Sequence, residues 1–228
     1  MKLYHNLTRC RFLYRVNRFI AHCEVDGADV PVHVKNTGRL GELLLPGATT
    51  WLEGSANPAR KTAYDLVAVE NRGYVVNIDS QATNPVAAEW ILGGGWGEGV
   101  KDLRREVTHG DSRFDLAFTH NGVPTLVEIK GVTLFDEAGT ALFPDAPTQR
   151  GVKHLQGLTR ASREGMECGV CFVIQREDVK CLRPNDATHP AFGQALREAQ
   201  EAGVRIVAAV CRVAPEGAEI VGTVPVGL

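Results

Sequence analysis

The sequence lacks any uninterrupted apolar run long enough for a transmembrane helix or for the core of a secretory signal. It also lacks a strong excess of one charge, because the formal net charge of the 228 residues is −2. That charge argues against a protein that coats nucleic acid through its overall field alone. The hydrophobic fraction of 44% and the charged fraction of 23% are those of an ordinary globular protein. We therefore expect a cytoplasmic protein without a membrane partner.

Paired metal-binding cysteines are also missing. Cys168 and Cys171 have the C-x-x-C spacing of a zinc or redox site, but no second Cys/His pair accompanies them. Several of the six cysteines lie in apolar runs, where a free thiol packs as a small hydrophobic group. This pattern predicts reduced cysteines in a reducing compartment. The G-x-S-x-G, H-E-x-x-H, Walker lysine and EF-hand motifs are absent as well.

Residues 1–23 contain no acidic residue. Their basic residues are Lys2, Arg9, Arg11, Arg15 and Arg18. Two interpretations remain open: a solvated strand edge, or a face that binds nucleic acid or another anion. A mitochondrial presequence fits less well, because the segment continues into a strand pattern without a break.

Strand-like runs and helical patterns divide the chain. The first third has short strand-like runs at residues 16–25, 30–34, 49–52, 64–70 and 74–78. Five short strands predict a small barrel, such as the OB type, or a small sandwich. Asn84-Pro85 then predicts the start of a helix with Asn84 as its N-cap, and the glycine-rich residues 93–99 predict a flexible connection. Further helices at about 148–164 and 191–202, between strands, predict a mixed α/β sheet.

A hairpin over residues 112–130 carries most of the chemical information. Asn121-Gly122 lies between two strand-like runs and is a strong hairpin signal. A turn centred there pairs Asp115 with Glu128, which places two carboxylates on one sheet face about 5 Å apart. Lys130 projects from the same face, because side chains alternate along a strand. Two like charges so close together require a cation, and a divalent metal is the expected one.

The expected cofactor is Mg²⁺ or Mn²⁺, held by Asp115, Glu128 and the backbone carbonyl of Ile129. Lys130 would then stabilise the negative charge that develops on a phosphodiester in the transition state. The alternative is a set of surface ion pairs in which Arg113 and Lys130 neutralise the two carboxylates.

The flanking helices add further candidates. Glu89, on the helix before the hairpin, is a candidate for an additional metal carboxylate. The helix after the hairpin combines an N-terminus, which attracts anions, with basic side chains; a solvated amphipathic helix is the alternative. The candidate DNA- or phosphate-binding residues from these features are Arg18, Arg113, Gln149, Arg150, Lys153 and His154.

Asp115 followed by Glu128-Ile129-Lys130 resembles the PD-(D/E)XK nuclease signature. The whole chain resembles the sugar fermentation stimulation protein A family, which is a more specific match. The matching segments follow the family's order and are residues 18–21, 36–39, 60–62, 112–115, 127–133, 143–146 and 148–154. Lys35 and Leu40 depart from the family pattern, and neither belongs to the metal core.

The resemblance implies an OB-like, nucleic-acid-binding β-barrel over residues 1–82 and a restriction-endonuclease-like mixed α/β domain over residues 83–228. It also implies DNA binding with little sequence specificity and a Mg²⁺- or Mn²⁺-dependent endo- or exonuclease with Asp115, Glu128 and Lys130 at its core. The family motif from Asn36 to Arg39 is expected to contact phosphate or the domain interface. Asn36 and Arg39 are therefore added to the candidate DNA-binding residues.

Other functions and assemblies stay open. The chain could be a DNA-binding regulator of sugar metabolism without significant turnover. It could also be a metal-dependent hydrolase of a small phosphorylated metabolite. The sequence leaves the oligomeric state open, a homodimer included.

Overall fold

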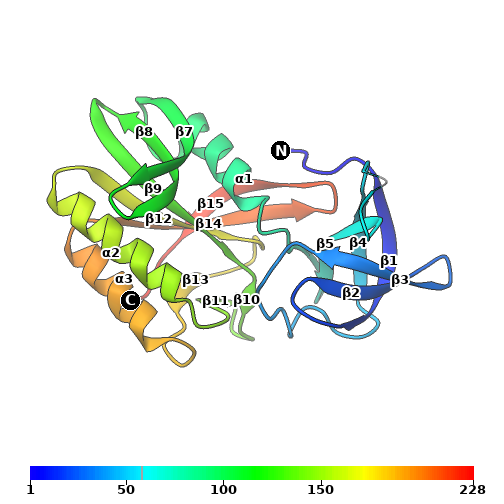
Figure 1. The fold of residues 1–228 in the computed structure, drawn as a ribbon. Coiled ribbons are helices and arrows are strands. Elements are labelled where there is room, and N and C mark those ends of the chain that lie inside the picture. The colour runs from blue at the N-terminus through cyan, green and yellow to red at the C-terminus, as the bar shows by residue number, and fades with distance from the viewer. Residues whose placement is uncertain (58) are drawn as a thin grey trace.

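The computed structural model describes residues 1–57 and 59–228. Figure 1 shows a small barrel formed by the N-terminal part beside a larger sheet that carries helices on both faces. The chain passes from one to the other between β6 (Tyr74–Asn77) and α1 (Thr83–Trp90). The predicted fold class, a β-barrel followed by a mixed α/β sheet, is confirmed. The boundary between residues 82 and 83 stays a prediction.

The barrel strands lie side by side in the order β3-β2-β1-β4-β5. The two strands at the ends of this order, β3 and β5, pair in parallel and close the barrel. The strand β6 pairs with β5 as well. Its interior contains the buried side chains of Phe12, Val32, Leu52 and Leu66. The five barrel strands are β1 (Leu7–Arg15), β2 (Ile20–Val25), β3 (Ala28–Val34), β4 (Thr49–Gly54) and β5 (Tyr64–Asn71).

One strand of the barrel begins later in the sequence than predicted. Residues 16–25 were predicted as a single run, but residues 16–19 form the turn between β1 and β2. The strand β1 was not predicted, because Arg9 and Arg11 project outward from it and dilute its apolar pattern. Its inward-facing Phe12 is buried.

The larger sheet has the strand order β15-β14-β12-β9-β8-β7. Its central strands β9, β12 and β14 are parallel, and the outer pairings are antiparallel. A small sheet, β10-β11-β13, lies beside it. The strands are β7 (Val100–His109), β8 (Ser112–His120), β9 (Val123–Val132), β10 (Leu134–Phe135), β11 (Thr140–Phe143), β12 (Glu167–Ile174), β13 (Cys181–Pro184), β14 (Arg205–Ala214) and β15 (Gly217–Val224).

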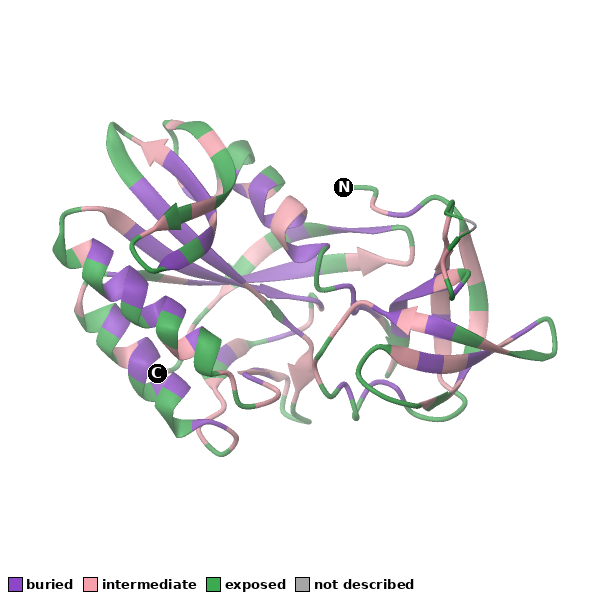
Figure 2. Ribbon diagram, in the orientation of Figure 1, coloured by how far each residue is buried: buried purple, intermediate pink, exposed green. Residues whose placement is uncertain are grey.

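Helices cover both faces of this sheet, and Figure 2 shows the central strands buried between them. α2 (Gln149–Arg163) and α3 (Pro190–Glu201) pack on one face through a cluster that includes Leu155, Phe172 and Phe192. α1 packs on the other face through a cluster that includes Ile129 and Val173. A polar side chain on β9 is therefore enclosed unless it lies near a strand end.

Two local predictions need correction. Asn84 is not the N-cap of α1, because Ala82 occupies that position. The amide of Asn84 is consequently available for a tertiary contact. The glycine-rich segment forms a π-helical turn, η1 (Ile91–Gly95), and the buried Trp96 follows it with its indole N–H donating to Oε1 of Glu167 at 2.9 Å. This packing replaces the expected flexible connection.

Across the part of the chain that the structure describes, the helices are too short or too polar to cross a membrane.

Candidate functional site

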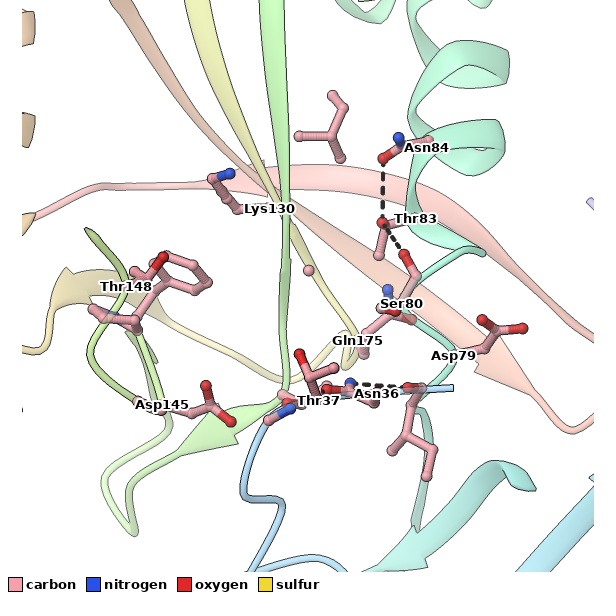
Figure 3. A pocket seen from close by; sticks show the side chains of 18 of the residues that line it. Asn36, Thr37, Asp79, Ser80, Thr83, Asn84, Lys130, Asp145, Thr148 and Gln175 are labelled. Atoms are coloured by element: carbon pink, nitrogen blue, oxygen red, sulfur yellow. Dashed lines mark hydrogen bonds between the residues drawn. The ribbon is translucent and has the colours of Figure 1, made fainter. Parts of the chain in front are cut away.

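A cleft of about 740 Å³ lies between the barrel and the larger sheet. Figure 3 shows side chains from several parts of the chain around it. Asn36 and Thr37 come from the barrel loop after β3, while Thr83 and Asn84 come from the start of α1. Lys130 comes from β9. The cleft therefore combines residues that are far apart in the sequence.

The predicted hairpin and its register are confirmed. Asn121 and Gly122 form the turn with φ values of 51° and 86°, and Leu116 pairs with Val127. The observed pairing ends at Leu116 and Val127, so the pairing of Asp115 with Glu128, one position further from the turn, stays a prediction, and Asp115 is instead tied to β9 by the backbone N–H of Ile129. The side chains of Asp115 and Glu128 both line the cleft.

Asp115 is held by two hydrogen bonds. Its Oδ2 accepts from the backbone N–H of Ile129 at 2.7 Å, and its Oδ1 accepts from Nδ2 of Asn84 at 3.0 Å. Burial, and then the negative charge of Glu128, raise the pKa of Asp115 above its usual value. The ionised carboxylate is thus costly in the free protein, although its geometry is fixed.

Glu128 is 2% exposed and has two cationic or proton-donating neighbours on one oxygen. Its Oε1 accepts from Nδ1 of His154 and from Nζ of Lys130, the latter at 2.5 Å. Burial alone would raise the pKa of Glu128, but the hydrogen bond from His154 and the charge of Lys130 outweigh burial and lower it. Glu128 is therefore an anion at neutral pH.

The second oxygen of Glu128 has no partner. Its Oε2 is one of two buried side-chain polar atoms in residues 1–57 and 59–228 that lack a hydrogen bond. A buried, unsatisfied carboxylate oxygen next to a second carboxylate fits a hard divalent cation, which prefers oxygen ligands. No cluster of three or more His, Cys, Asp or Glu is found in the described residues, so any remaining ligands would be carbonyls, water or substrate oxygens.

The ion-pair alternative holds only in part. Glu128 and Lys130 do form an ion pair, but it is buried and leaves Oε2 of Glu128 free. Arg113 does not neutralise the carboxylates of the cleft and instead contacts Glu106 at 3.3 Å on the exposed edge. Surface neutralisation therefore does not account for the arrangement.

Three of the predicted DNA- or phosphate-binding residues line the cleft: Arg18, Asn36 and Arg150. Arg18 lies in the β1–β2 turn, and Arg150 in the first turn of α2. Asn36 hydrogen-bonds within the protein, because its amide donates to the carbonyl of Ile78 at 2.9 Å. The two arginines are thus the predicted groups with free charge at the cleft.

Glu89 is the clearest error among the predicted site residues. It lies on the exposed side of α1, where its Oε2 is 3.3 Å from the N-terminal amine of Met1. The core-facing side of that helix carries Val86 and Ala87 instead. Asn84, one helical turn earlier, is the α1 residue that reaches Asp115.

The other candidates lie outside the cleft lining. Lys153 contacts Asp111 at 3.5 Å, and Gln149 is exposed. Arg39 contributes its backbone N–H, which donates to Oδ2 of Asp145 at 3.0 Å. His154 is buried and donates to Glu128 rather than facing a phosphate. Its predicted phosphate contact is therefore wrong.

The residue with the largest role that sequence reasoning missed is Arg15. Its guanidinium donates to five backbone carbonyls, which accept at 2.7–3.0 Å. These carbonyls belong to Asn17, Arg18, Asn36, Gly38 and Arg39. Arg15 thereby joins the β1–β2 turn to the loop after β3.

That loop also packs closely on the second part of the chain. A Cβ atom at Gly38 would lie 2.3 Å from Oδ2 of Asp145, so only glycine fits there without a shift. The motif from Asn36 to Arg39 therefore lies at the interface between barrel and sheet. The sequence left open whether this motif contacts phosphate or the domain interface, and the structure shows it at the interface.

Comparison with known proteins identifies the family. Residues 13–78 match the SfsA N-terminal OB domain, and residues 81–217 match the sugar fermentation stimulation protein RE domain. The chain belongs to the SfsA family. Both the predicted family and the OB assignment of the barrel are confirmed.

Relatives of this SfsA-family chain match it over almost the whole length. The sugar fermentation stimulation protein homolog of Desulfitobacterium hafniense strain Y51 is 46% identical over 216 residues, 95% of this chain and 94% of that protein. The homolog of Acetivibrio thermocellus is 43% identical over 231 residues, with 99% of each chain covered. The structure of Pyrococcus furiosus SfsA in complex with Ca²⁺ is 29% identical, has a TM-score of 0.89, and covers 100% of this chain and 98% of that one.

Proposed function

We propose that this SfsA-family protein is a divalent-metal-dependent phosphodiesterase that binds DNA in the interdomain cleft. The observation that carries the proposal is the unpartnered Oε2 of Glu128, which is buried beside Asp115 in a cleft that also contains Lys130. The Ca²⁺ complex of the Pyrococcus furiosus relative supports the binding of a divalent cation. Mg²⁺ or Mn²⁺ is the proposed cofactor.

Asp115 and Glu128 would hold the cation, with the backbone carbonyl of Ile129 as a further ligand. When bound, a divalent cation lowers the pKa of a coordinated water and neutralises phosphate charge. Asn84 and the N–H of Ile129 keep the Asp115 carboxylate oriented.

Three cationic side chains act on the substrate. Arg18 and Arg150 both line the cleft, one from the barrel and one from α2, and would bind and orient the phosphodiester. The ammonium of Lys130 would stabilise the negative charge that develops on the phosphoryl oxygens. His154 would position Glu128 without touching the substrate.

The charge of the cleft makes phosphate binding depend on the cation. Seven charged side chains line it: Asp79, Asp115, Glu128, Asp145, Arg18, Lys130 and Arg150. Four are acidic and three are basic, so the formal charge is −1 before a cation binds and positive after a divalent cation binds. DNA should therefore bind more tightly with the cation than with EDTA.

The test incubates the purified protein with linear, supercoiled and single-stranded DNA in Mg²⁺, Mn²⁺ or EDTA. We expect metal-dependent cleavage that is lost in Asp115→Asn and Lys130→Ala and retained in Glu89→Gln, the control on the exposed side of α1. Absence of cleavage, combined with salt-sensitive DNA binding in both variants, would instead indicate a DNA-binding regulator. Cleavage of small phosphorylated metabolites but not of DNA would indicate the small-molecule hydrolase.

A further inference from the structure

Two buried side-chain atoms in residues 1–57 and 59–228 lack a hydrogen-bonding partner, and both belong to residues that line the interdomain cleft. The first is Oε2 of Glu128, which a cation would satisfy. The second is Oε1 of Gln175, a residue that is 2% exposed. A buried polar atom without a partner raises the free energy of the folded protein. A ligand that forms the missing hydrogen bond therefore gains binding free energy.

Gln175 cannot share the cation with Glu128. Glu128 pairs with Val170 across β9 and β12, and Gln175 lies five residues beyond Val170. At about 3.3 Å per residue, the separation along the strand is roughly 16 Å. Because ligand–metal distances are only about 2–2.6 Å, one ion cannot contact both side chains.

Gln175 also faces a different part of the cleft. Val173, two residues earlier, packs against α1. Side chains two residues apart on a strand point to the same face, so Gln175 lies on the face of the sheet that α1 covers. The backbone N–H of Gln175 donates to the carbonyl of Val132 at 3.0 Å, which fixes the start of the side chain. Figure 3 shows Gln175 in the same cleft as Asn36 and Ser80.

Two polar residues of the same cleft, Asn36 and Ser80, already have partners within the protein. Asn36 donates to the carbonyl of Ile78 and accepts from the N–H of Gly38. The hydroxyl of Ser80 donates to the carbonyl of Lys35 at 2.6 Å. The buried Oε1 of Gln175, in contrast, has no partner and is available to a ligand.

We infer that Gln175 accepts a hydrogen bond from the nucleoside part of the bound strand, several nucleotides away from the phosphate at the metal site. A phosphodiester has no hydrogen-bond donor, whereas base amino groups and ribose 2′-hydroxyls are donors. Adjacent nucleotides rise about 3.4 Å along a strand, so a span of roughly 16 Å requires an extended ligand. This inference rests on the proposed function and makes Gln175 a specificity-determining residue.

The experiment measures the affinity of wild type and Gln175→Met for labelled oligonucleotides in Ca²⁺, by fluorescence anisotropy. Met has a similar volume and cannot accept the hydrogen bond. Matched oligonucleotides differ either in the sugar, ribose or deoxyribose, or in the base at one position. Gln194→Met is the control, because Gln194 is exposed on α3 and bonds to Glu198.

We expect Gln175→Met to weaken binding roughly fivefold for oligonucleotides that carry the donor, with unchanged Ca²⁺ affinity. A loss confined to ribo-oligonucleotides assigns the donor to the 2′-hydroxyl, and a loss that follows one base assigns it to the base edge. The unfolding temperature of the free variant should not fall, because an unsatisfied polar atom has been removed.

Two results would overturn the inference in different ways. If wild type binds oligonucleotides and Gln175→Met binds all of them equally well, the inference alone fails and the proposed function stands. If wild type binds no oligonucleotide in Ca²⁺, the proposed function fails and the inference fails with it.

Discussion

The imidazole of His154 donates from Nδ1 to Oε1 of Glu128, in the buried layer between α2 and β9. The other ring nitrogen, Nε2, accepts from Nε of Arg150 at 3.4 Å, which leaves the proton on Nδ1. Lys130 donates to the same carboxylate oxygen of Glu128. As a result, one oxygen of Glu128 is held by the protein and the other is left for a ligand. Carboxylates that bind metals are commonly oriented in this way by neighbours that do not touch the metal.

Replacing His154 should therefore weaken cation binding without removing a ligand. We expect His154→Asn to lower Ca²⁺ affinity by about tenfold, the lower end of the effect of such outer partners. Isothermal titration calorimetry measures the dissociation constant directly. His109→Asn is the control, since His109 is half-buried outside the cleft lining and contacts Glu164 at 3.6 Å. Equal Ca²⁺ affinity in all three proteins would show that His154 does not position Glu128.

Asp115→Asn should separate stability from cation binding. Burial and the charge of Glu128 raise the pKa of Asp115, so the folded state disfavours its ionised form. In the absence of metal the neutral amide should raise the unfolding temperature at pH 7, with Asn84 turning its amide oxygen toward the new N–H group. Ca²⁺ affinity should fall by more than the roughly tenfold expected for His154→Asn. A lower unfolding temperature in EDTA would contradict the electrostatic account.

Asp65 should make the stability of the barrel depend on acid pH. Burial alone would raise its pKa, but hydrogen bonds from Arg60 and His33 and the charge of Lys35 lower it from 3.8 to about 2. Because the folded-state pKa is depressed, the stabilisation is present above pH 3.8 and is lost as the pH falls toward 2. The difference in pKa corresponds to about 2 kcal/mol.

Urea unfolding of wild type and Asp65→Asn at several pH values tests this expectation. At pH 7 the variant should be less stable by about 2 kcal/mol, and the two free energies should converge as the pH falls from 3.8 toward 2. A difference that stays constant between pH 7 and pH 2 would show that the effect is not the carboxylate charge.

Arg18 and Arg150 should each contribute a phosphate contact. Arg18→Ala and Arg150→Ala should weaken DNA binding and reduce the slope of log affinity against log salt by about one each. Arg113→Ala is the matched control, because Arg113 contacts Glu106 on the exposed edge. A slope that changes as much in Arg113→Ala as in the other two would locate the DNA elsewhere on the surface.

Arg15→Lys should affect the cleft loops and leave the metal site intact. Lysine keeps the charge but cannot bond to the five carbonyls that the guanidinium joins. We expect a lower unfolding temperature and weaker DNA binding with unchanged Ca²⁺ affinity. Arg9→Lys, at an exposed position of the same strand, should match wild type. A changed Ca²⁺ affinity in Arg15→Lys would mean that the barrel loops reach the metal position.

Local rules in the sequence were sufficient for the hairpin. Asn121-Gly122 favours positive φ at both turn positions, and this turn sets the observed register, in which Leu116 pairs with Val127 beside Asp115 and Glu128. Strand alternation then places Lys130 beside Glu128, as observed. Helix ends were predicted within one or two residues for α2 and α3, because capping and glycine signals are local.

Contacts between residues far apart in the sequence could not be predicted from such local rules. Glu89 was expected at the metal site because it is an acid on the helix before the hairpin, but the rotation of α1 about its axis is set by the apolar packing of Val86 and Ala87. Asn84 looked like a helix cap, and its contact with Asp115 spans 31 positions. The partners of Arg15 are backbone carbonyls, which every residue has and no sequence pattern distinguishes.

The sequence by itself therefore determined the family, the order of barrel and mixed sheet, and the pair of carboxylates with a neighbouring lysine, since each depends on short segments with strong local preferences. Only the tertiary structure decided which oxygens are satisfied. It assigned His154 to Glu128, buried Oε1 of Gln175 without a partner, and placed the loop around Gly38 against Asp145. These relationships arise where separate elements pack together, and packing depends on the whole chain.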